Sequence, residues 1–320
     1  MIIVTGANGF VGRALCAHFL RIGRPFRAIV RRHAPGTELD SHHHAVEDLA
    51  TTPDAELDEL FAGAAAIVHL AGRAHVADDG APDSEALYHR ANVVATARLA
   101  QSAVRVGVAR FVFASTAKVN GEASTSGRPF DPDDTPSPQG AYACSKHEAE
   151  RVLLAACAGT ATAPIVLRLP LVYGPGVKAN FLTLMDEVAS GRALPLGAVR
   201  NRRSLLFVGN LVEAIDAALV ASPAPAGVHF LADAEPVSVP DLVRAIATAL
   251  GVKARLVRVP VPLLQLGGRM LGKGSVVNRL TLSMEVDASS FGAATGWRPR
   301  YSLAQGLAVT GGWWRTRHAL

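Results

Sequence analysis

The chain is expected to adopt an α/β fold, with a Rossmann-type doubly wound parallel sheet followed by a smaller mixed C-terminal domain. Three observations predict this. Short β-branched or apolar runs alternate with Ala- and Leu-rich stretches through the first half, and the first run leads directly into a loop with three glycines. Beyond residue 170, Gly and Pro become frequent and the periodic stretches shorten. Buried parallel strands read as continuous hydrophobic runs, and their alternation with helices is typical of a doubly wound sheet.

The length of 320 residues suggests about two domains. We expect residues 1–169 to form the first domain and residues 170–320 the second. Residues 205–231 read as a helix and then a strand, and they are expected to return to the first domain. The strands are predicted at Ile2–Thr5, Phe26–Val30, Ala66–Leu70, Arg110–Ala114 and Ile165–Leu169. The helices are predicted at Gly12–Ile22, Leu87–Val106, Ala141–Ala158, Asn180–Ser190, Leu211–Val220 and Val239–Leu250.

Composition excludes several classes of protein. Hydrophobic residues make up 49% and charged residues 18%, which is ordinary for a soluble α/β protein. The net charge is +5, but no basic run is interleaved with aromatic residues, so a nucleic-acid partner is not expected. The apolar run 261–266 is short and contains Pro and Gln, so no membrane insertion is expected. The excess of Arg fits anionic small ligands, with solubility alone as the alternative.

The three cysteines, Cys16, Cys144 and Cys157, form neither a disulfide framework nor a metal set. His42–His44 has no further ligand at suitable spacing, so we expect a solvated loop there and no metal. The first strand-like run begins at residue 1, which leaves no room for a secretory leader. A cytoplasmic location is therefore expected.

The loop after the first strand predicts a dinucleotide site. Residues 5–12 read Thr-Gly-Ala-Asn-Gly-Phe-Val-Gly, and a helix is expected to follow. Glycines at such a turn allow a tight bend and a close approach to a pyrophosphate, for which the helix N-terminus supplies N–H donors. The first domain is therefore a dinucleotide-binding domain. The expected cofactor contacts in this loop are Gly6, Asn8, Gly9, Phe10, Val11 and Gly12.

The end of the second strand indicates which dinucleotide binds. An acidic residue there binds the ribose 2′-hydroxyl of NAD, whereas an Arg accommodates the 2′-phosphate of NADP. This chain has Arg31 and Arg32 after Val30, and no acid. Two guanidinium groups suit a phosphate. The pattern favours NADP(H), with NAD(H) as the alternative cofactor and a solvated Arg pair as the alternative reading.

Tyr142 and Lys146 are the candidate catalytic pair. A separation of four residues places both side chains on one face of a helix. A neighbouring ammonium is expected to lower the pKa of a Tyr hydroxyl, which would make Tyr142 a general acid or base. Taken alone, this common spacing fits an exposed helix face equally well.

Together with the glycine loop and the segment His69-Leu70-Ala71-Gly72, this pair gives the chain a resemblance to the extended short-chain dehydrogenase/reductases. These include nucleotide-sugar epimerases, dehydratases and 4-ketoreductases, and the resemblance covers essentially the whole length. It implies an NAD(P)-dependent enzyme whose C-terminal domain binds a nucleotide sugar. It also implies a homodimer, in which helices 87–106 and 141–158 of two copies pair.

The resemblance assigns roles to further residues. It places Asp48 and Leu49 against the adenine. Asn92 and Thr116, with Ser115 beside it, would join Tyr142 and Lys146 as the catalytic group. The remaining cofactor contacts that it implies are Leu70, Ala71, Gly72 and Pro170, with Tyr142 and Lys146 also on the cofactor.

Two departures from the family pattern narrow the range of activities to be expected. Dehydratases that remove the 6-hydroxyl carry an Asp-Glu pair where this chain has Ala117 and Lys118, so 4,6-dehydration lacks its acid and base. Epimerases often carry a Tyr at the position of Asn120. The stretches 118–122, 169–181 and 201–205 resemble bacterial polysaccharide enzymes that act on UDP-N-acetyl-4-keto-6-deoxyhexosamines, of the UDP-N-acetylquinovosamine or UDP-N-acetylfucosamine type. Relatives that are 4-epimerases share much of this pattern.

On the substrate side, the resemblance places Asn180 and Arg203 on the diphosphate of the UDP-sugar. An Arg fork matches pyrophosphate oxygens, and Asn offers both a donor and an acceptor. Lys118 reaches either the sugar or the diphosphate, with a structural role as the alternative.

The expected function is therefore NADP(H)-dependent reduction of the C4 ketone of a UDP-4-keto-6-deoxy-N-acetylhexosamine, in the biosynthesis of surface polysaccharide such as O-antigen or capsule. The first alternative is an NAD-dependent UDP-sugar 4-epimerase acting on UDP-GlcNAc or UDP-glucose, which would use the same residues. The second is a cofactor-sensing protein without catalysis, a class that typically lacks the Tyr/Lys pair.

Overall fold

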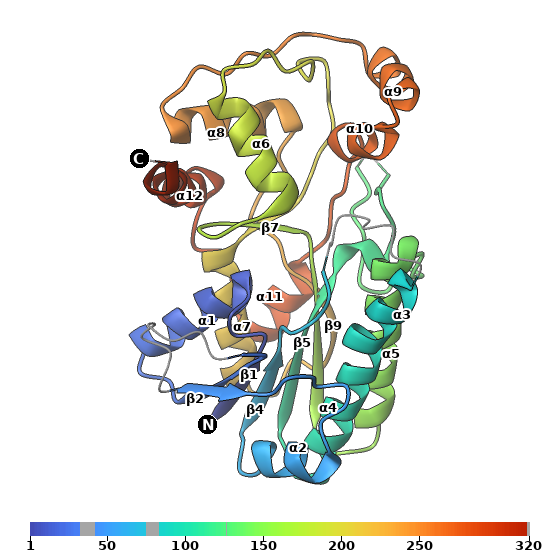
Figure 1. Ribbon diagram of the computed structural model, residues 1–320, viewed down its shortest axis with the longest axis vertical. Helices are drawn as coiled ribbons and strands as arrows, with labels where there is room; N and C mark the ends of the chain where they lie inside the picture. Colours follow the sequence, from blue (N-terminus) through green and yellow to red (C-terminus); the bar gives the residue numbers. More distant parts are fainter. Residues whose placement is uncertain (33–41, 75–82, 126, 319–320) are drawn as a thin grey trace.

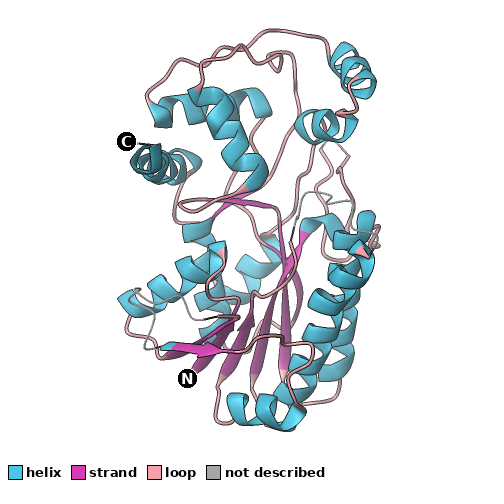
Figure 2. Cartoon of the chain, viewed as in Figure 1, coloured by secondary structure: helices cyan, strands magenta, loops and turns pink. Residues whose placement is uncertain are grey.

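The computed structural model describes residues 1–32, 42–74, 83–125 and 127–318. Figure 1 shows two stacked parts, a larger one built on a parallel sheet and a smaller, mostly helical one that contains the C-terminus. The helices and strands of each part appear as separate layers in Figure 2. The larger sheet has seven strands in the order β3-β2-β1-β4-β5-β6-β9, and every pair is parallel. Its strands are β1 (Ile2–Thr5), β2 (Phe26–Val30), β3 (His43–Ala45), β4 (Ala66–His69), β5 (Arg110–Thr116), β6 (Ala163–Leu169) and β9 (Gly227–Phe230).

The strand order confirms the expected fold class. From β1 the chain winds outward through β2 to β3, then crosses back and winds the other way through β4, β5, β6 and β9. The direction changes between β1 and β4, where Thr5 lies opposite His69. Ligands of open α/β sheets bind at the carboxyl ends of the strands at such a switch point. The fold therefore directs attention to the residues that follow β1 and β4.

Helices cover both faces of the sheet, because successive side chains of each strand point to opposite sides. Val4 of β1 packs into a core with α1, α7 and α11. Its neighbour Ile3 packs into the opposite core with α2, α4 and α5. The two layers lie on either side of the sheet in Figure 1. Their helices are α1 (Phe10–Arg21), α2 (Asp54–Phe61), α3 (Ser84–Tyr88), α4 (Ala95–Arg105), α5 (Gly140–Cys157), α7 (Val208–Val220) and α11 (Ser289–Thr295).

The smaller part forms its own core. Its two strands, β7 (Leu171–Tyr173) and β8 (Leu205–Phe207), pair in parallel. Residues 205–231, which we expect to return to the larger part, divide between the two: β8 stays with β7, whereas α7 packs against α1 and β9 pairs with β6. The helices of this part are α6 (Ala179–Ala189), α8 (Val239–Leu250), α9 (Val261–Met270), α10 (Gly274–Thr281) and α12 (Leu303–His318). In the described ranges, no helix combines the length and hydropathy needed to span a membrane.

Two local expectations differ from the structure. Residues 87–106 are not one regular helix, because a π-helical turn, His89–Val94, separates α3 from α4. His43 and His44 lie in the edge strand β3, so the prediction of a solvated loop at His42–His44 is wrong for these two residues. His42 stacks on Phe26 of β2, with ring centroids 4.6 Å apart. Pairing with β2 satisfies backbone groups that a loop would leave to solvent.

Candidate active site

The glycine loop between β1 and α1 is compact enough to require glycine at two positions. Gly6 has a φ of +68°, and a Cβ there would lie 2.6 Å from the backbone nitrogen of Ala71. A Cβ on Gly12 would lie 2.2 Å from the carbonyl oxygen of Gly6. The close approach of Gly6 to Ala71 places the loop directly against the segment that follows β4.

The N-terminus of α1 is open to an anion. Gly9 occupies the N-cap position, and no side chain caps the helix. Asn8 is exposed, and its carbonyl accepts a hydrogen bond from Arg13. The side chain of Phe10 packs toward the smaller part and that of Val11 toward the sheet. Among the residues that the structure describes, no side chain accepts from the N–H groups of this first turn. An uncapped helix start beside closely packed glycines fits a dinucleotide pyrophosphate.

Arg31 and Arg32 are exposed on the bend that follows β2. The nearby acid, Asp48, is already engaged: its carboxylate accepts hydrogen bonds from the Ala50 backbone and from Arg90, the latter at 2.5 Å. Partial burial works against ionisation of Asp48, but these hydrogen bonds and the charges of Arg90 and Arg31 hold its pKa below the usual value. Within the described part of the chain, the end of β2 is therefore a positively charged corner.

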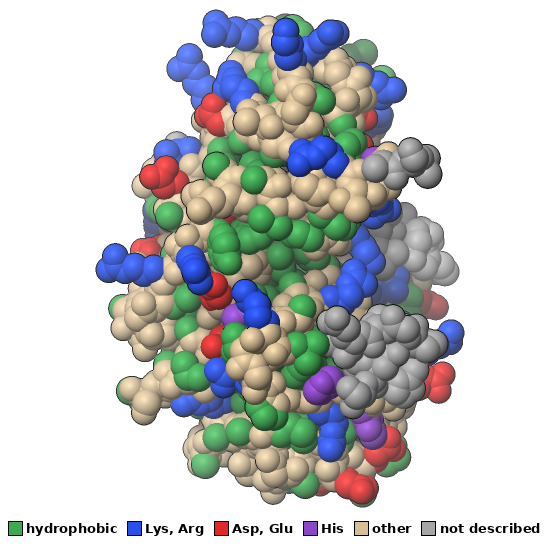
Figure 3. All heavy atoms as spheres, turned by 90° about the vertical axis from the view of Figure 1, so that its left-hand side faces the viewer, with side chains coloured by type: hydrophobic (Ala, Val, Ile, Leu, Met, Phe, Trp, Pro, Cys, Tyr) green, Lys and Arg blue, Asp and Glu red, His purple; other side chains and the backbone are tan. Residues whose placement is uncertain are grey.

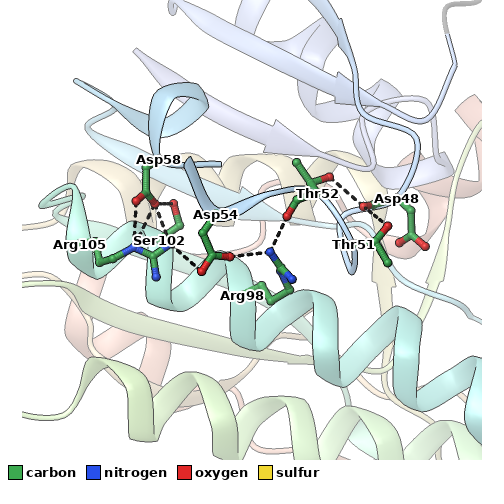
Figure 4. A network of polar contacts seen from close by, with 8 residues as sticks. All are labelled: Asp48, Thr51, Thr52, Asp54, Asp58, Arg98, Ser102 and Arg105. Carbon is green, nitrogen blue, oxygen red and sulfur yellow. Dashed lines mark hydrogen bonds and ion pairs between the residues drawn. The ribbon is translucent and has the colours of Figure 1, made fainter. Parts of the chain in front are cut away.

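Hydrogen bonds join the loop that carries Asp48 and Leu49 to α4, as Figure 4 shows. Thr52 donates a hydrogen bond of 2.8 Å to the carbonyl of Asp48, and Arg98 of α4 donates to the carbonyl of Thr52. Leu49 packs against the core on this side of the sheet. The same row of contacts continues along α4 and includes Asp54, Asp58, Ser102 and Arg105.

A directional hydrogen-bond chain runs beneath the ends of β1 and β4. The backbone N–H of Ala71 donates to the Thr5 hydroxyl, which lies 2.7 Å from Nδ1 of His69. Nε2 of His69 lies 3.1 Å from the Thr96 hydroxyl, which donates to the carbonyl of Asn92. Burial, with a contribution from the Lys146 charge, lowers the pKa of His69 to about 3. His69 is therefore neutral, and one of its ring nitrogens accepts a hydrogen bond while the other donates one.

Asn92 lies in the π-helical turn and is buried there. Its side chain accepts from the backbone N–H of Arg73 at 2.8 Å and donates to the carbonyl of Arg73. It also donates to the Ser145 hydroxyl at 2.9 Å, and Ser145 in turn donates to the carbonyl of Tyr142. Asn92 thus ties the segment after β4 to the turn of α5 that holds the candidate catalytic pair. A Cβ on Gly72 would lie 2.9 Å from Oδ1 of Asn92, so a larger residue there would displace the Asn92 side chain.

Tyr142 and Thr116 come together at the carboxyl end of β5. A hydrogen bond with the Thr116 side chain favours the ionised form of Tyr142, but burial outweighs it and raises the pKa of Tyr142 to about 12. The expectation that Lys146 lowers this pKa is therefore wrong for this structure. The tyrosine holds its proton at neutral pH, as a proton donor must.

Lys146 is buried, and its Nζ lies 3.8 Å from the centroid of the Phe113 ring. Burial lowers the pKa of Lys146 to about 7, although the charge of Glu150 opposes the change. An ammonium this poorly solvated can exchange its proton near neutral pH.

The structure does not place Ser115 with Tyr142. Adjacent residues of a strand point to opposite sides, and the Ser115 hydroxyl donates to the carboxylate of Glu150. Glu150 forms a buried ion pair with Arg168 at 2.7 Å, and Arg168 also donates to Asn120. Ser115 belongs to this charged network behind the site.

The substrate-side candidates Lys118, Arg203 and Asn180, and the cofactor candidate Pro170, lie in different segments, and the backbone N–H of Lys118 donates to the Thr116 hydroxyl. Lys118 pairs with Glu122 at 2.8 Å. Arg203 donates to the carbonyls of Arg279 and Leu282, and its partial burial lowers its pKa, while Glu122 raises it. Asn180 is exposed at the start of α6, and Pro170 is buried between β6 and β7.

Sequence reasoning missed the residues that hold the site in place. Thr5, Thr96 and Ser145 link the catalytic turn to the cofactor loops through single hydroxyl groups, which carry no distinctive spacing. Tyr88 packs against Tyr142 with ring centroids 6.0 Å apart. Within the described residues, no group of three or more His, Cys, Asp and Glu side chains could hold a metal ion.

Comparison with known proteins agrees with this geometry. Residues 2–230 match the model of the NAD dependent epimerase/dehydratase family. The chain is 36% identical over 310 residues to a UDP-glucose 4-epimerase of Vibrio cholerae, covering 97% of this chain and 94% of that protein. It is 27% identical over 325 residues to an N-acetyl-alpha-D-glucosaminyl-diphospho-ditrans,octacis-undecaprenol 4-epimerase of Escherichia coli O157:H7, covering 97% and 93%. A solved structure of MoeE5 with UDP-glucuronic acid and NAD superposes with a TM-score of 0.78 at 26% identity, covering 100% and 99%.

Proposed function

The chain belongs to the NAD dependent epimerase/dehydratase family, and on that premise we propose that it is an NADP(H)-dependent reductase of UDP-4-keto-6-deoxy-N-acetylhexosamines, acting in surface polysaccharide biosynthesis. The observation that carries the reductase assignment is the end of β2, where Arg31 and Arg32 are exposed and Asp48 is held by Arg90. Such a corner suits a 2′-phosphate. An exchangeable NADPH suits net reduction.

The proposed chemistry uses the groups that meet at the end of β5. When bound, the nicotinamide supplies the hydride that C4 of the sugar receives. Tyr142 donates its proton to the C4 oxygen, and Thr116 hydrogen-bonds that oxygen. Lys146 holds the nicotinamide ribose and stabilises negative charge on Tyr142 once the proton has left. Asn92 would anchor a water through Oδ1, because both hydrogens of its amide are donated to Arg73 and Ser145, and this water would return a proton through Lys146.

The surroundings of Thr116 support reduction over dehydration. The position after Thr116 is the buried methyl group of Ala117, and Lys118 is paired with Glu122. Elimination of a 6-hydroxyl needs an acid and a base at these positions, and neither residue supplies a carboxyl group.

A UDP-sugar 4-epimerase is the second candidate. It is favoured by the 36% identity to the UDP-glucose 4-epimerase of Vibrio cholerae and by the NAD in the MoeE5 structure. An epimerase oxidises and re-reduces one substrate, so it retains its cofactor and shows no net consumption of NADPH.

The substrate assay separates the two candidates. We expect the purified protein to oxidise NADPH when freshly generated UDP-4-keto-6-deoxy-GlcNAc is supplied, and not with UDP-GlcNAc or UDP-glucose. Absorbance at the nicotinamide band and chromatography of the UDP-sugars provide the two readouts. Tightly bound NAD+ in the purified protein, together with interconversion of UDP-GlcNAc and UDP-GalNAc, would establish the epimerase instead.

The Arg pair is expected to set the cofactor preference. Replacing Arg31 and Arg32 by Ser should raise the KM for NADPH by about 100-fold or more, because each charge-assisted hydrogen bond to a phosphate contributes about 1.5–3 kcal/mol. The KM for NADH should change little. Arg244→Ser, on an exposed pair with Asp241, is the matched control. Equal effects on both cofactors would show that the Arg pair does not bind a 2′-phosphate.

A further inference from the structure

The positive charge of this chain is concentrated in one segment of the smaller part. Between Asp241 and Glu285 there is no acidic residue, although the whole chain has 32 basic and 27 acidic residues and a net charge of +5. The segment holds seven basic residues, so the rest of the chain is slightly acidic. These residues are Arg244, Lys253, Arg255, Arg258, Arg269, Lys273 and Arg279.

The helix α9 in this segment is apolar on two faces. One face packs inward: Leu264 contacts the core of the smaller part, and Gly268 lies against Val277 of α10. The other face is exposed and carries Leu263, Leu266 and Met270, spaced three and four residues apart and therefore on one stripe. Their exposed fractions are 59%, 57% and 80%. An ordinary surface helix has a polar face here.

The apolar stripe continues beyond the helix. Leu271, which follows α9, is 75% exposed, and Val257 before it and Val276 of α10 are exposed as well. Soluble proteins expose single apolar residues routinely, but a contiguous apolar surface marks an interaction site. We call Leu263, Leu266, Met270 and Leu271 the α9 face.

Within the described part of the chain, cations without ion pairs precede and follow α9 in the sequence, and two of them adjoin the α9 face directly: Arg269 lies within α9 and Lys273 follows it. Lys253, Arg255, Arg258, Arg269 and Lys273 are exposed, and across the residues that the structure describes, none of them forms an ion pair. Figure 1 shows α9 and α10 at the end of the molecule farthest from the parallel sheet. Figure 3 shows the opposite face of the molecule, turned away from α9 and α10, where Lys and Arg side chains also lie at the upper end.

We propose that the α9 face binds peripherally to an anionic lipid bilayer. Exposed leucine and methionine side chains with flanking Lys and Arg are the features with which a helix lies in the membrane interface, where apolar burial and attraction to anionic headgroups add. The charge argues against a second copy of this chain, because two such faces would bring like charges together. The exposed leucines argue against nucleic acid as the partner, because its phosphates would attract the cations but the apolar stripe would contribute nothing to that binding.

The face adjoins the substrate side of the protein. The carbonyls of Arg279 and Leu282, at the end of α10, accept hydrogen bonds from Arg203. Binding through α9 would therefore hold the smaller part at the lipid surface, while the parallel sheet and the glycine loop remain away from it. This geometry leaves the cofactor side accessible from solution.

Vesicle sedimentation tests the proposal with the full-length protein. We expect wild-type protein to co-sediment with vesicles of phosphatidylethanolamine and phosphatidylglycerol at 7:3, and at least tenfold less with vesicles of phosphatidylcholine. The triple variant L263S/L266S/M270S should lose binding about tenfold or more, because the apolar contribution is removed. Arg269→Gln with Lys273→Gln should weaken binding comparably and reduce its dependence on salt.

Two controls make the result specific. Val220→Ser and Val309→Ser remove exposed apolar side chains elsewhere, and they should leave vesicle binding unchanged. Thermal melts should give midpoints for all variants within a few degrees of wild type, because the changed side chains are exposed.

If the triple serine variant still binds anionic vesicles, the cations alone bind a polyanion and the proposal fails. If that variant instead converts an oligomer of wild type to a smaller species without any vesicle binding by either, the face joins copies of this chain and the proposal also fails.

Discussion

Tyr142→Phe is expected to reduce turnover by about 10²–10⁴-fold while leaving cofactor affinity nearly unchanged. General acid catalysis by a positioned side chain contributes a factor of this size. The hydroxyl is the group that Thr116 contacts, and burial raises the pKa of Tyr142 to about 12, so the residue carries its proton at neutral pH. Phenylalanine keeps the ring that packs against Tyr88 and removes only the hydroxyl group, and with it the proton to be donated.

The measurement is kcat with a 4-keto UDP-sugar, alongside the dissociation constant of NADPH from fluorescence titration. Tyr301→Phe is the matched control, because its ring packs on Phe207 in the smaller part and takes no part in the proposed chemistry. A Tyr142→Phe protein that keeps turnover within threefold of wild type would remove Tyr142 from the mechanism. A non-catalytic cofactor sensor would keep its full function with this substitution.

Arg168→Met is expected to give the largest loss of stability, about 3–5 kcal/mol in the free energy of unfolding. Removing one partner of a buried ion pair leaves an uncompensated charge, and losses of this size follow. Arg168 and Glu150 are 4% and 2% exposed, and Arg168 contacts the carboxylate through two nitrogens. The same carboxylate accepts from Ser115, so the effect should extend to the end of β5.

Urea denaturation at pH 7 measures this loss. Adding Glu150→Gln to Arg168→Met should recover part of it, because the buried charge is gone. Arg244→Ser breaks an exposed pair and should cost no more than about 1 kcal/mol. If Arg168→Met lowers the free energy of unfolding by less than about 1 kcal/mol, the Arg168–Glu150 ion pair does not stabilise the fold.

The pH dependence of stability should differ in sign between wild type and Arg168→Met. In wild type, burial acts to raise the pKa of Glu150, but the neighbouring His147, the hydrogen bonds from Arg168 and Ser115, and the Arg168 charge bring it below its ordinary value of 4.5. This contribution is present above pH 4.5 and is lost as the pH falls through the lower value in the folded state. Without Arg168, burial raises the pKa of Glu150. The Arg168→Met variant therefore becomes more stable as the pH falls and Glu150 is protonated.

Much of the fold could be predicted because its signals are local. Val239–Leu250 is a helix over the predicted residues, with Ser238 capping its start and Gly251 in the left-handed conformation at its end. The strand Phe26–Val30 also has the predicted bounds, because its apolar run is ended by charged residues. Other helices differ by a few residues at their ends, where fraying and capping decide the boundary.

The π-helical turn at His89–Val94 could not be predicted in this way. The local sequence suits a regular α-helix, and the departure coincides with a tertiary contact, in which Asn92 holds both backbone groups of Arg73. The strand at His43–Ala45 is likewise decided by its partner β2. Neither partner is near in the sequence.

The sequence by itself determined the alternation of strands and helices, the glycine loop and the pairing of Tyr142 with Lys146 on one helix face, because these depend on neighbours within one or two turns of chain. Only the tertiary structure decided the electrostatics of that pair. Burial raises the pKa of Tyr142 to about 12 and lowers that of Lys146 to about 7. Tertiary structure also placed Ser115 on Glu150 and left one apolar face of α9 in solvent. Burial is a property of the whole packed chain, and no spacing of residues encodes it directly.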